Sequence, residues 1–420
     1  MIRYSRFGEK MACRSGIMEL MDDLGKAMSG AEKMLMLGGG NPADIPEMQD
    51  VWRRAMQGLV GNRERFDSVL CHYDTSQGNP RFLEAVAGLF RDVYGWPIGP
   101  SNVAVTNSSQ TAYFMLLNAL AGEFADGGKR RVLLPLSPEY IGYADQGLAS
   151  DFFTARRPAM KLAGDHEFKY HIDFDNLALD RDVGALCVSR PTNPTGNVLT
   201  DEEVRRLAET AKAHRRPLFI DNAYGAPFPN IIFHDVHPIW DENIVVTLSL
   251  SKLGLPGTRT GIVIASQDLI ATLSSINAIV SLASGNIGQA LVTPLIEDRR
   301  ILKLSRDIIR PFYRDRLQAA LAWVDDYFDR DLPWRLHTCE GALFLWLWCR
   351  DMPLSSREFY ERLKARGVLV VPGCYFFYGL EDEWTHSEEC IRINYSQPES
   401  VVRDGLKIIG EEIREIYLNR

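Results

Sequence analysis

The chain has no long apolar run and no paired cysteines, two absences that narrow its class. Its longest apolar stretch, residues 342–349, has the length of a strand and falls far short of the ~18 residues that a membrane span needs. The seven cysteines are scattered and include no Cys-x-x-Cys pair, which disfavours a disulfide framework or a zinc site. The N-terminus carries charged residues but no apolar core of a secretory signal. We therefore expect a cytoplasmic location and no membrane partner.

Basic residues are fewer than acidic ones. The sequence has 47 Lys and Arg against 55 Asp and Glu, a formal net charge of −8. A chain with this balance and no basic patch is a poor match for nucleic acid. The eight histidines show no spacing typical of metal ligands, so the sequence predicts no metal site. With 46% apolar and 24% charged residues, the 420-residue chain has the composition of a globular protein and the length for two domains.

Short apolar segments alternate with amphipathic ones between about residues 100 and 265. Strands that are apolar on both faces and alternate with helices indicate an α/β fold, with a mainly parallel sheet between helices. After a long helical stretch at 301–328, the pattern becomes that of a smaller α+β domain. We predict an N-terminal segment (1–45) that packs on the small domain and the site, a large domain (46–300) and a small C-terminal domain (301–420). The strands predicted for the large domain are 103–106, 132–136, 185–188, 218–220, 244–248 and 260–265.

Lys252 lies in the most informative segment, directly after the apolar strand at 244–248. Burial disfavours the ammonium form and lowers the pKa of a lysine, which frees its amine to attack an aldehyde. Ser249, Ser251 and Arg259 are the residue types that hold a phosphate ester. An aldehyde and a phosphate together indicate pyridoxal 5′-phosphate (PLP), a cofactor that is held covalently by a lysine. The alternative is a solvated lysine in an ordinary surface loop.

A second segment, 217–225, places Asp221 at the end of a predicted strand. Ligands of parallel α/β sheets bind at the carboxyl ends of the strands. There, the Asp221 carboxylate would pair with the protonated pyridine nitrogen of PLP, and Tyr224 would place its phenol on the 3-oxygen. The alternative is that Asp221 caps a following helix.

Three more features support an anion-binding cofactor site. In the turn sequence Asn193-Pro194-Thr195-Gly196, the Asn193 amide could donate to the cofactor's 3-oxygen or to a substrate carboxylate, although a plain turn is the alternative. Segment 106–112 joins a strand to a helix, where free N–H groups bind phosphate, although simple serine capping uses the same atoms. Arg392 alternates with apolar neighbours in a predicted strand, and its fork could hold a carboxylate unless it forms a surface ion pair.

With these residues in view, the chain resembles the class I aminotransferases, PLP enzymes of fold type I, over nearly all of its length. Stretches at 37–48, 137–145, 187–197 and 249–261 are similar to family members that use valine and pyruvate. The resemblance implies ping-pong transamination, through pyridoxamine phosphate, between an apolar amino acid such as valine or alanine and a 2-oxo acid such as pyruvate or 3-methyl-2-oxobutanoate. Another fold type I enzyme, such as a decarboxylase or a lyase, could share every cofactor residue. A non-enzymatic ligand sensor is a more remote alternative.

The resemblance also implies a role for each site residue. Lys252 would carry PLP and move the substrate proton, with Asp221 at the pyridine nitrogen and Tyr140 stacked on the ring. Tyr73 would reach the phosphate of a neighbouring subunit, so the active unit would be a homodimer with a shared site. The phosphate would be held by Ser108, Ser109, Gln110, Ser249, Ser251 and Arg259; the 3-oxygen by Tyr224 and Asn193; and the substrate carboxylate by Arg392, Asn193, Gly39 and Gly40.

The sequence departs from the family in the segment expected to bind the phosphate, residues 107–110 (the phosphate loop), and near residues expected to select the substrate. Ser108 stands where relatives have glycine, and its Cβ is expected to shift the loop slightly. Cys374 and Tyr375 stand where the enzymes acting on valine have His and Asn, and the segment 283–288 also differs. We expect the choice of amino-acid side chain to depend on apolar residues at the mouth of the site. The candidates are Ile17, Met18 and the loop at 374–375.

Overall fold

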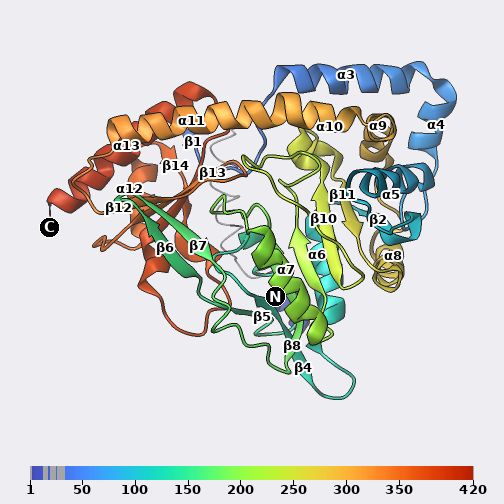
Figure 1. The fold of residues 1–420 in the computed structure, drawn as a ribbon, viewed down its shortest axis with the longest axis horizontal. Helices are drawn as coiled ribbons and strands as arrows, with labels where there is room; N and C mark the ends of the chain where they lie inside the picture. The colour runs from blue at the N-terminus through green and yellow to red at the C-terminus, as the bar shows by residue number, and fades with distance from the viewer. Residues whose placement is uncertain (1, 13–17, 19–24, 26–33, 420) are drawn as a thin grey trace.

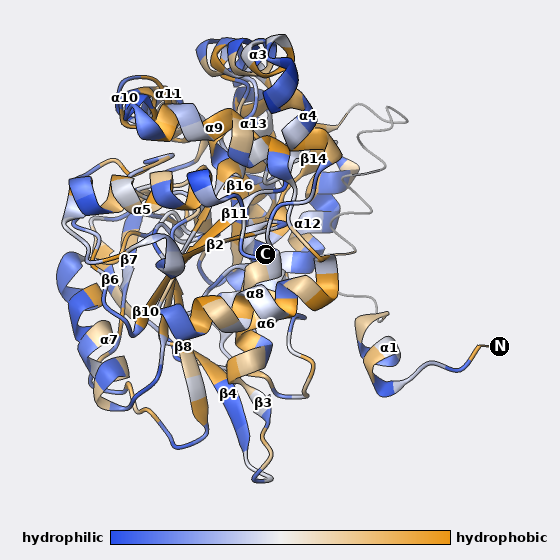
Figure 2. Cartoon of the chain, turned by 90° about the vertical axis from the view of Figure 1, so that its right-hand side faces the viewer, coloured by the Kyte–Doolittle hydropathy of each residue, from blue (hydrophilic) through white to orange (hydrophobic). Residues whose placement is uncertain are grey.

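The computed structural model describes residues 2–12, 18, 25 and 34–419. Two sheets organise it, and Figure 1 shows helices packed around both. The short helix α1 (Arg6–Met11) lies near the N-terminus beside the body of the molecule, as Figure 2 shows. No helix in the described part of the chain combines the length and the apolar character that crossing a bilayer requires.

The larger sheet has eight strands in the order β2-β11-β10-β9-β8-β4-β3, with β5 paired to β4. Strands β4, β8, β9 and β10 run parallel, whereas β11 is antiparallel to both β10 and β2. The six strands predicted for this region all form, within a few residues of the predicted ends. The bounds are β2 (Val103–Thr106), β3 (Gly122–Glu123), β4 (Lys129–Leu134), β5 (Phe153–Ala155), β8 (Val183–Ser189), β9 (Leu218–Asp221), β10 (Ile244–Ser249) and β11 (Gly261–Ile264).

Both faces of β8, β9, β10 and β11 are buried, which explains why these strands are mostly apolar. Alternate residues of each strand enter one of two apolar clusters. Phe219 and Val245 pack with α6 (Ser109–Leu120) and α8 (Gln267–Ser281), whereas Ile220 and Val246 belong to the cluster that includes residues of α5 (Pro80–Tyr94), α7 (Asp201–Ala213) and α9 (Asn286–Glu297). In Figure 2, α7 carries both orange and blue residues, as expected for a helix with one face in the core.

The second sheet has six strands in the order β15-β16-β13-β12-β7-β6. Its bounds are β6 (Ala159–Ala163), β7 (Glu167–His171), β12 (Trp334–His337), β13 (Phe344–Cys349), β15 (Val371–Pro372) and β16 (Cys390–Asn394). The hairpin β6–β7 comes from within the range predicted as the large domain, yet β7 pairs with β12. The sheet therefore crosses the predicted boundary at residue 300, and the division into domains stays a prediction.

Residues 34–45 of the predicted N-terminal segment join the region of the second sheet. Strand β1 (Leu35–Met36) pairs with β14 (Val368–Leu369), and the backbone of Leu37 accepts a hydrogen bond from Asn394. The next two helices are α3 (Pro46–Gly61) and α4 (Arg63–Cys71). This path brings the residues before α3 between the two sheets.

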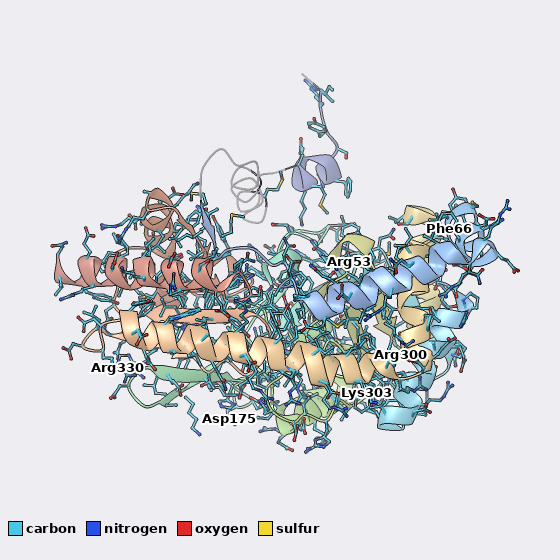
Figure 3. All side chains as sticks on the ribbon, turned by 90° about the horizontal axis from the view of Figure 1, so that it is seen from above. Arg53, Phe66, Asp175, Arg300, Lys303 and Arg330 are labelled. Carbon is cyan, nitrogen blue, oxygen red and sulfur yellow. The ribbon has the colours of Figure 1, made fainter. Side chains whose placement is uncertain are left out.

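A long helix links the two parts of the molecule. It comprises α10 (Arg300–Leu304), a π turn (Ser305–Ile309) and α11 (Arg310–Tyr327), in agreement with the helix predicted at 301–328. Seen from above in Figure 3, it crosses the molecule from Lys303 towards Arg330. Helix α11 packs on α13 (Glu399–Leu418), and α12 (Ser356–Ala365) packs beside β14 and β15.

Candidate active site

A cavity of about 360 Å³ opens at the carboxyl ends of β8, β9 and β10. The strand register aligns these ends, because Ser189 of β8 and Thr247 of β10 both pair with Asp221 of β9. The cavity brings together nearly all the site residues predicted within one chain. Its lining includes Gly40, Ser108, Ser109, Gln110, Tyr140, Asn193, Asp221, Tyr224, Ser249, Ser251, Lys252, Arg259 and Arg392.

Lys252 lies in the 3-10 turn that follows β10, with its amine inside the cavity. The Nζ atom donates to the backbone oxygen of Gly40 and lies 5.2 Å from the centre of the Tyr224 ring. Burial and the nearby charge of Arg392 lower the pKa of Lys252 to about 8. The neutral amine that an aldehyde requires is therefore accessible near physiological pH.

Asp221 ends β9 and is buried beside the cavity. Its carboxylate accepts hydrogen bonds from the Tyr143 hydroxyl and, at 2.9 Å, from the backbone N–H of Ala223. A turn follows β9, so the alternative that Asp221 caps a helix is wrong. Burial raises the pKa of Asp221, whereas the bond from Tyr143 and the charge of Lys252 oppose the rise. A cationic ring nitrogen would favour the ionised form further.

Arg392, on β16, is only 3% exposed, so the alternative of a surface ion pair is wrong. Its guanidinium donates to the side-chain oxygen of Asn193 at 2.8 Å and to the backbone oxygen of Gly38 at 2.6 Å. The Nε atom has no hydrogen-bond partner in the described structure. Burial lowers the pKa of Arg392 to about 10, so it remains a cation at neutral pH. Because no carboxylate among the described side chains is bonded to it, this charge suits the carboxylate of a ligand.

The end of the cavity near α6 fits a phosphate. Helix α6 begins at Ser109, and the first N–H groups of a helix have no carbonyl of their own helix to bond. Arg259 supplies a cation on the same cavity wall. The Ser108 hydroxyl accepts from Thr111, so Ser108 is the N-cap residue as well. The capping alternative is therefore present in the structure, and it does not exclude phosphate binding at this helix end.

These groups fit PLP by their chemistry. An amine for the aldehyde, a carboxylate for the ring nitrogen and an anion cup line one cavity, together with the phenol of Tyr224. Burial raises the pKa of Tyr224, so the phenol keeps its proton and can donate to a 3-oxygen. Tyr140 lines the same cavity.

Some predicted residues lie elsewhere in the structure. Tyr73, on the loop after α4, is 83% exposed, and Gly39 is outside the cavity lining, where its oxygen accepts from Asn394. Met18 is exposed and does not line the cavity, and Ile17 lies outside the described residues.

The loop at 374–375 does not line the cavity either, so its predicted part in side-chain choice is not supported. The backbone of Cys374 bonds the Ser356 hydroxyl, and the ring of Tyr375 lies under Arg357. The helix α12 that carries both partners therefore holds this loop away from the cavity.

Sequence reasoning missed two side chains at the site, Tyr143 and Glu139. Tyr143 bonds Asp221, and buried Glu139 bonds both Tyr140 and Ser189. Both lie in the segment 137–145 that carries the family resemblance, but no spacing rule links them to partners about fifty or more residues away. Only the fold makes these contacts visible.

Comparison with known proteins agrees with this geometry. The model of the family "Aminotransferase class I and II" matches residues 32–409, and the chain belongs to this family. Its members depend on PLP, which is therefore the cofactor. The chain is 48% identical over 416 residues to the valine–pyruvate aminotransferase of Escherichia coli K12, and the match covers 99% of both chains.

Solved structures give the same result. A protein from Psychrobacter arcticum superposes with a TM-score of 0.97 at 43% identity, covering 100% of both chains. The valine–pyruvate aminotransferase of Salmonella typhimurium LT2 superposes with a TM-score of 0.89 at 45% identity, covering 96% of this chain and 100% of that one. The predicted fold, that of the fold type I transferases, is thereby confirmed.

The backbone of Ser108 yields the first testable prediction. Its φ of 104° and ψ of 155° lie in a region that is open almost only to glycine and costs about 1–3 kcal/mol for other residues. Losing the cap to glycine costs only a few tenths of a kcal/mol. Ser108→Gly should therefore raise the free energy of unfolding by about 1 kcal/mol in a urea titration. Ser108→Ala, which keeps the strain and loses the cap, should lower it. A glycine variant no more stable than the alanine variant would contradict the strain.

The bond from Tyr143 to Asp221 yields the second prediction. Because this bond favours the ionised carboxylate, Tyr143→Phe should raise the already elevated pKa of Asp221. An elevated acid pKa costs stability as pH rises through it, so PLP-free Tyr143→Phe should lose about 1–3 kcal/mol near pH 8 and less near pH 4.

The matched control is Tyr113→Phe. The Tyr113 ring stacks on Tyr143, but its hydroxyl bonds Thr247 rather than Asp221. Its stability loss should therefore depend little on pH. Urea titrations at both pH values measure the difference, and equal pH dependence of the two variants would rule out the role of Tyr143.

Proposed function

We propose that this protein exchanges amino groups between valine, or an apolar neighbour such as alanine or 2-aminobutyrate, and pyruvate. The observation that carries the proposal is the set of cations in the cavity. Lys252, Arg259 and Arg392 are the Lys and Arg residues among its described lining. Each has a use at the aldehyde, the phosphate or the common carboxylate. None remains for a second, distal carboxylate, so an apolar side chain suits the site better than that of aspartate.

The two relatives that are 45–48% identical support the same substrates, since both are valine–pyruvate aminotransferases. The rest of the cavity lining includes the apolar residues Pro42, Ile141, Pro191 and Pro256. A decarboxylase or a lyase would use the same cofactor residues, but membership of the aminotransferase family favours amino transfer.

PLP, when bound, supplies the electron sink for the reaction. Around it, Arg392 would bind the substrate carboxylate, with Asn193 orienting the guanidinium through their 2.8 Å bond. Lys252, after release of its amine, would carry a proton to and from the substrate Cα. Asp221 would keep the ring nitrogen protonated, and Tyr224 would donate to the 3-oxygen. Amino acid and oxo acid would react in turn at this one set of groups, in a ping-pong cycle.

The proposal includes a homodimer that shares its sites, in the cytoplasm. Tyr73 and the end of α8 expose several large apolar side chains, including Ile279, Val280 and Leu282. The loop that carries Tyr73 and helix α8 are bonded together, because the Asn277 side chain donates to the backbone oxygen of Ser76. Exposed apolar groups of this size are typical of protein interfaces. A second subunit on this surface would bury them and could receive the Tyr73 hydroxyl.

The substrate proposal predicts a graded series of half-reactions. Valine, 2-aminobutyrate and alanine should all convert bound PLP, with differences of about 1–3 kcal/mol per methylene, whereas aspartate should react poorly. Arg392→Ala should weaken every substrate by a similar factor, equivalent to roughly 2–5 kcal/mol. Stopped-flow absorption with an amino-acid and an oxo-acid panel measures both effects. Fast reaction of aspartate with valine inert would overturn the substrate and leave the family assignment intact.

The shared site predicts complementation between inactive variants. Tyr73→Ala and Lys252→Ala should each be strongly impaired. After refolding or subunit exchange of an equal mixture, half of the dimers should be mixed and should hold one intact site, restoring about a quarter of wild-type activity. Tyr73→Phe keeps the ring and removes the hydroxyl, so it measures the contribution of the hydroxyl alone. If Tyr73→Ala alone keeps full activity and PLP affinity, Tyr73 does not serve a neighbouring site.

A further inference from the structure

Glu139 is a buried acid at the site that is not paired with a cation. It is 1% exposed and directly precedes Tyr140 in the loop between β4 and the 3-10 turn η2 (Ile141–Tyr143). No ion pair involves it in the described structure. Its carboxylate instead accepts three hydrogen bonds: from Tyr140 N–H at 2.7 Å, from the Ser189 hydroxyl at 2.6 Å and from Ser189 N–H at 2.9 Å. A buried acid whose bonds are satisfied in this way holds the groups that donate to it in place.

We propose that Glu139 is a positioning residue of the PLP site, which fixes the Tyr140 ring and the end of β8 through these three bonds. Tyr140 and Ser189 both line the cavity. The proposal rests on the PLP site itself and not on the choice of amino acid.

Tyr140 depends on backbone bonds for its position. Its N–H is held by Glu139, and its oxygen accepts from the Tyr378 hydroxyl at 3.0 Å. On the other side, Gly142 leaves room for the ring, because a Cβ at that position would lie 2.3 Å from it. Both backbone groups of Tyr140 are therefore bonded, and its ring lies against Gly142. Removing the bond between Tyr140 N–H and Glu139 would leave the ring less firmly held and allow it to tilt.

The bonds to Ser189 act on the row of strand ends. Ser189 pairs with Asp221 in the register of β8 and β9. The next residue, Arg190, donates its N–H to the backbone oxygen of Asp221. Glu139 therefore ties the loop of Tyr140 to the strand beside Asp221. Its own N–H donates to the backbone oxygen of Phe376, at 3.0 Å, in the 3-10 turn η6 (Gly373–Phe376). Glu139 thus joins two segments that line the cavity and anchors them to a third that does not.

The charge state of Glu139 is finely balanced. Burial, with a smaller contribution from the charge of Asp221, raises its pKa to about 8, although the bonds from Ser189 and Tyr140 favour the ionised form. All three groups around the carboxylate donate hydrogen bonds to it. Glutamine at this position would turn its own N–H₂ donor towards at least one of these donors, and that bond would be lost. Glu139→Gln should therefore weaken the network, and Glu139→Ala should remove it.

The test is PLP retention and the induced circular dichroism of the bound cofactor, both measured on holoenzyme without substrate. Glu139→Ala should raise the PLP dissociation constant by roughly tenfold, the size of effect typical of lost positioning partners. At saturating PLP, its dichroism should also fall, because the ring of Tyr140 no longer has one orientation. Glu139→Gln and Ser189→Ala should show smaller changes in the same direction, and they keep the test open if the alanine variant folds poorly.

Glu203 offers a matched control. It is another buried carboxylate, bonded by the Thr200 hydroxyl and N–H and by the N–H of Ile172. It does not line the cavity. Glu203→Ala should lose stability while keeping wild-type PLP affinity and dichroism. If the Glu139 variants match wild type, or change no more than Glu203→Ala at equal stability, Glu139 is only structural and the proposal fails. Because no amino acid is present, this result does not depend on the proposed substrates.

Discussion

The parallel register of β8, β9 and β10 is the constraint on which the site depends. It places Ser189, Asp221 and Thr247 in one row, and Lys252 follows only five residues after Thr247. Each strand arrives buried on both faces, so its position is fixed by packing on helices of both layers. The short segments that leave the strands then begin from known points. Catalytic groups from distant parts of the chain can meet within a cavity of about 360 Å³ because the sheet holds these starting points still.

The second constraint is electrostatic. Among the described residues of its lining, the cavity has the basic side chains of Lys252, Arg259 and Arg392 and one carboxylate, that of Asp221. Burial and like charge make Lys252 easier to deprotonate, whereas Arg392 stays charged because a guanidinium starts from a far higher pKa. The same surroundings thus suit Lys252 to its proposed role as a nucleophile and Arg392 to its proposed role as a permanent anion binder. Which role each residue takes follows from its side-chain chemistry rather than from separate environments.

Many strands of the large sheet and many residues of the site could be predicted from the sequence, because local residue patterns indicate them. The strands of the large sheet appear as short apolar runs. Asp221 directly follows one of them, and Lys252 and Asn193 lie four and five residues after two others. The antiparallel placement of β11 and the pairing of β7 with β12 could not be predicted, since pairing between distant strands leaves no local signal. For the same reason Tyr143 and Glu139 went unnoticed, whereas Tyr73 was found only through family resemblance. Its proposed function requires a second chain, to which neither spacing nor periodicity refers.

The phosphate loop shows where local rules give way to the needs of the site. Strands β2 and β11 pair so that Gly261 lies opposite Thr106, immediately before the loop. A Cβ on Gly261 would lie 2.3 Å from the backbone nitrogen of Ser109, so only glycine permits this approach. Ser108 then adopts a conformation suited to glycine, which lets α6 begin at once and present its first N–H groups. The close packing of β2 and β11 fixes the chain on both sides of Ser108 and so maintains this strain. Relaxing Ser108 would move the N-terminus of α6 away from the cavity.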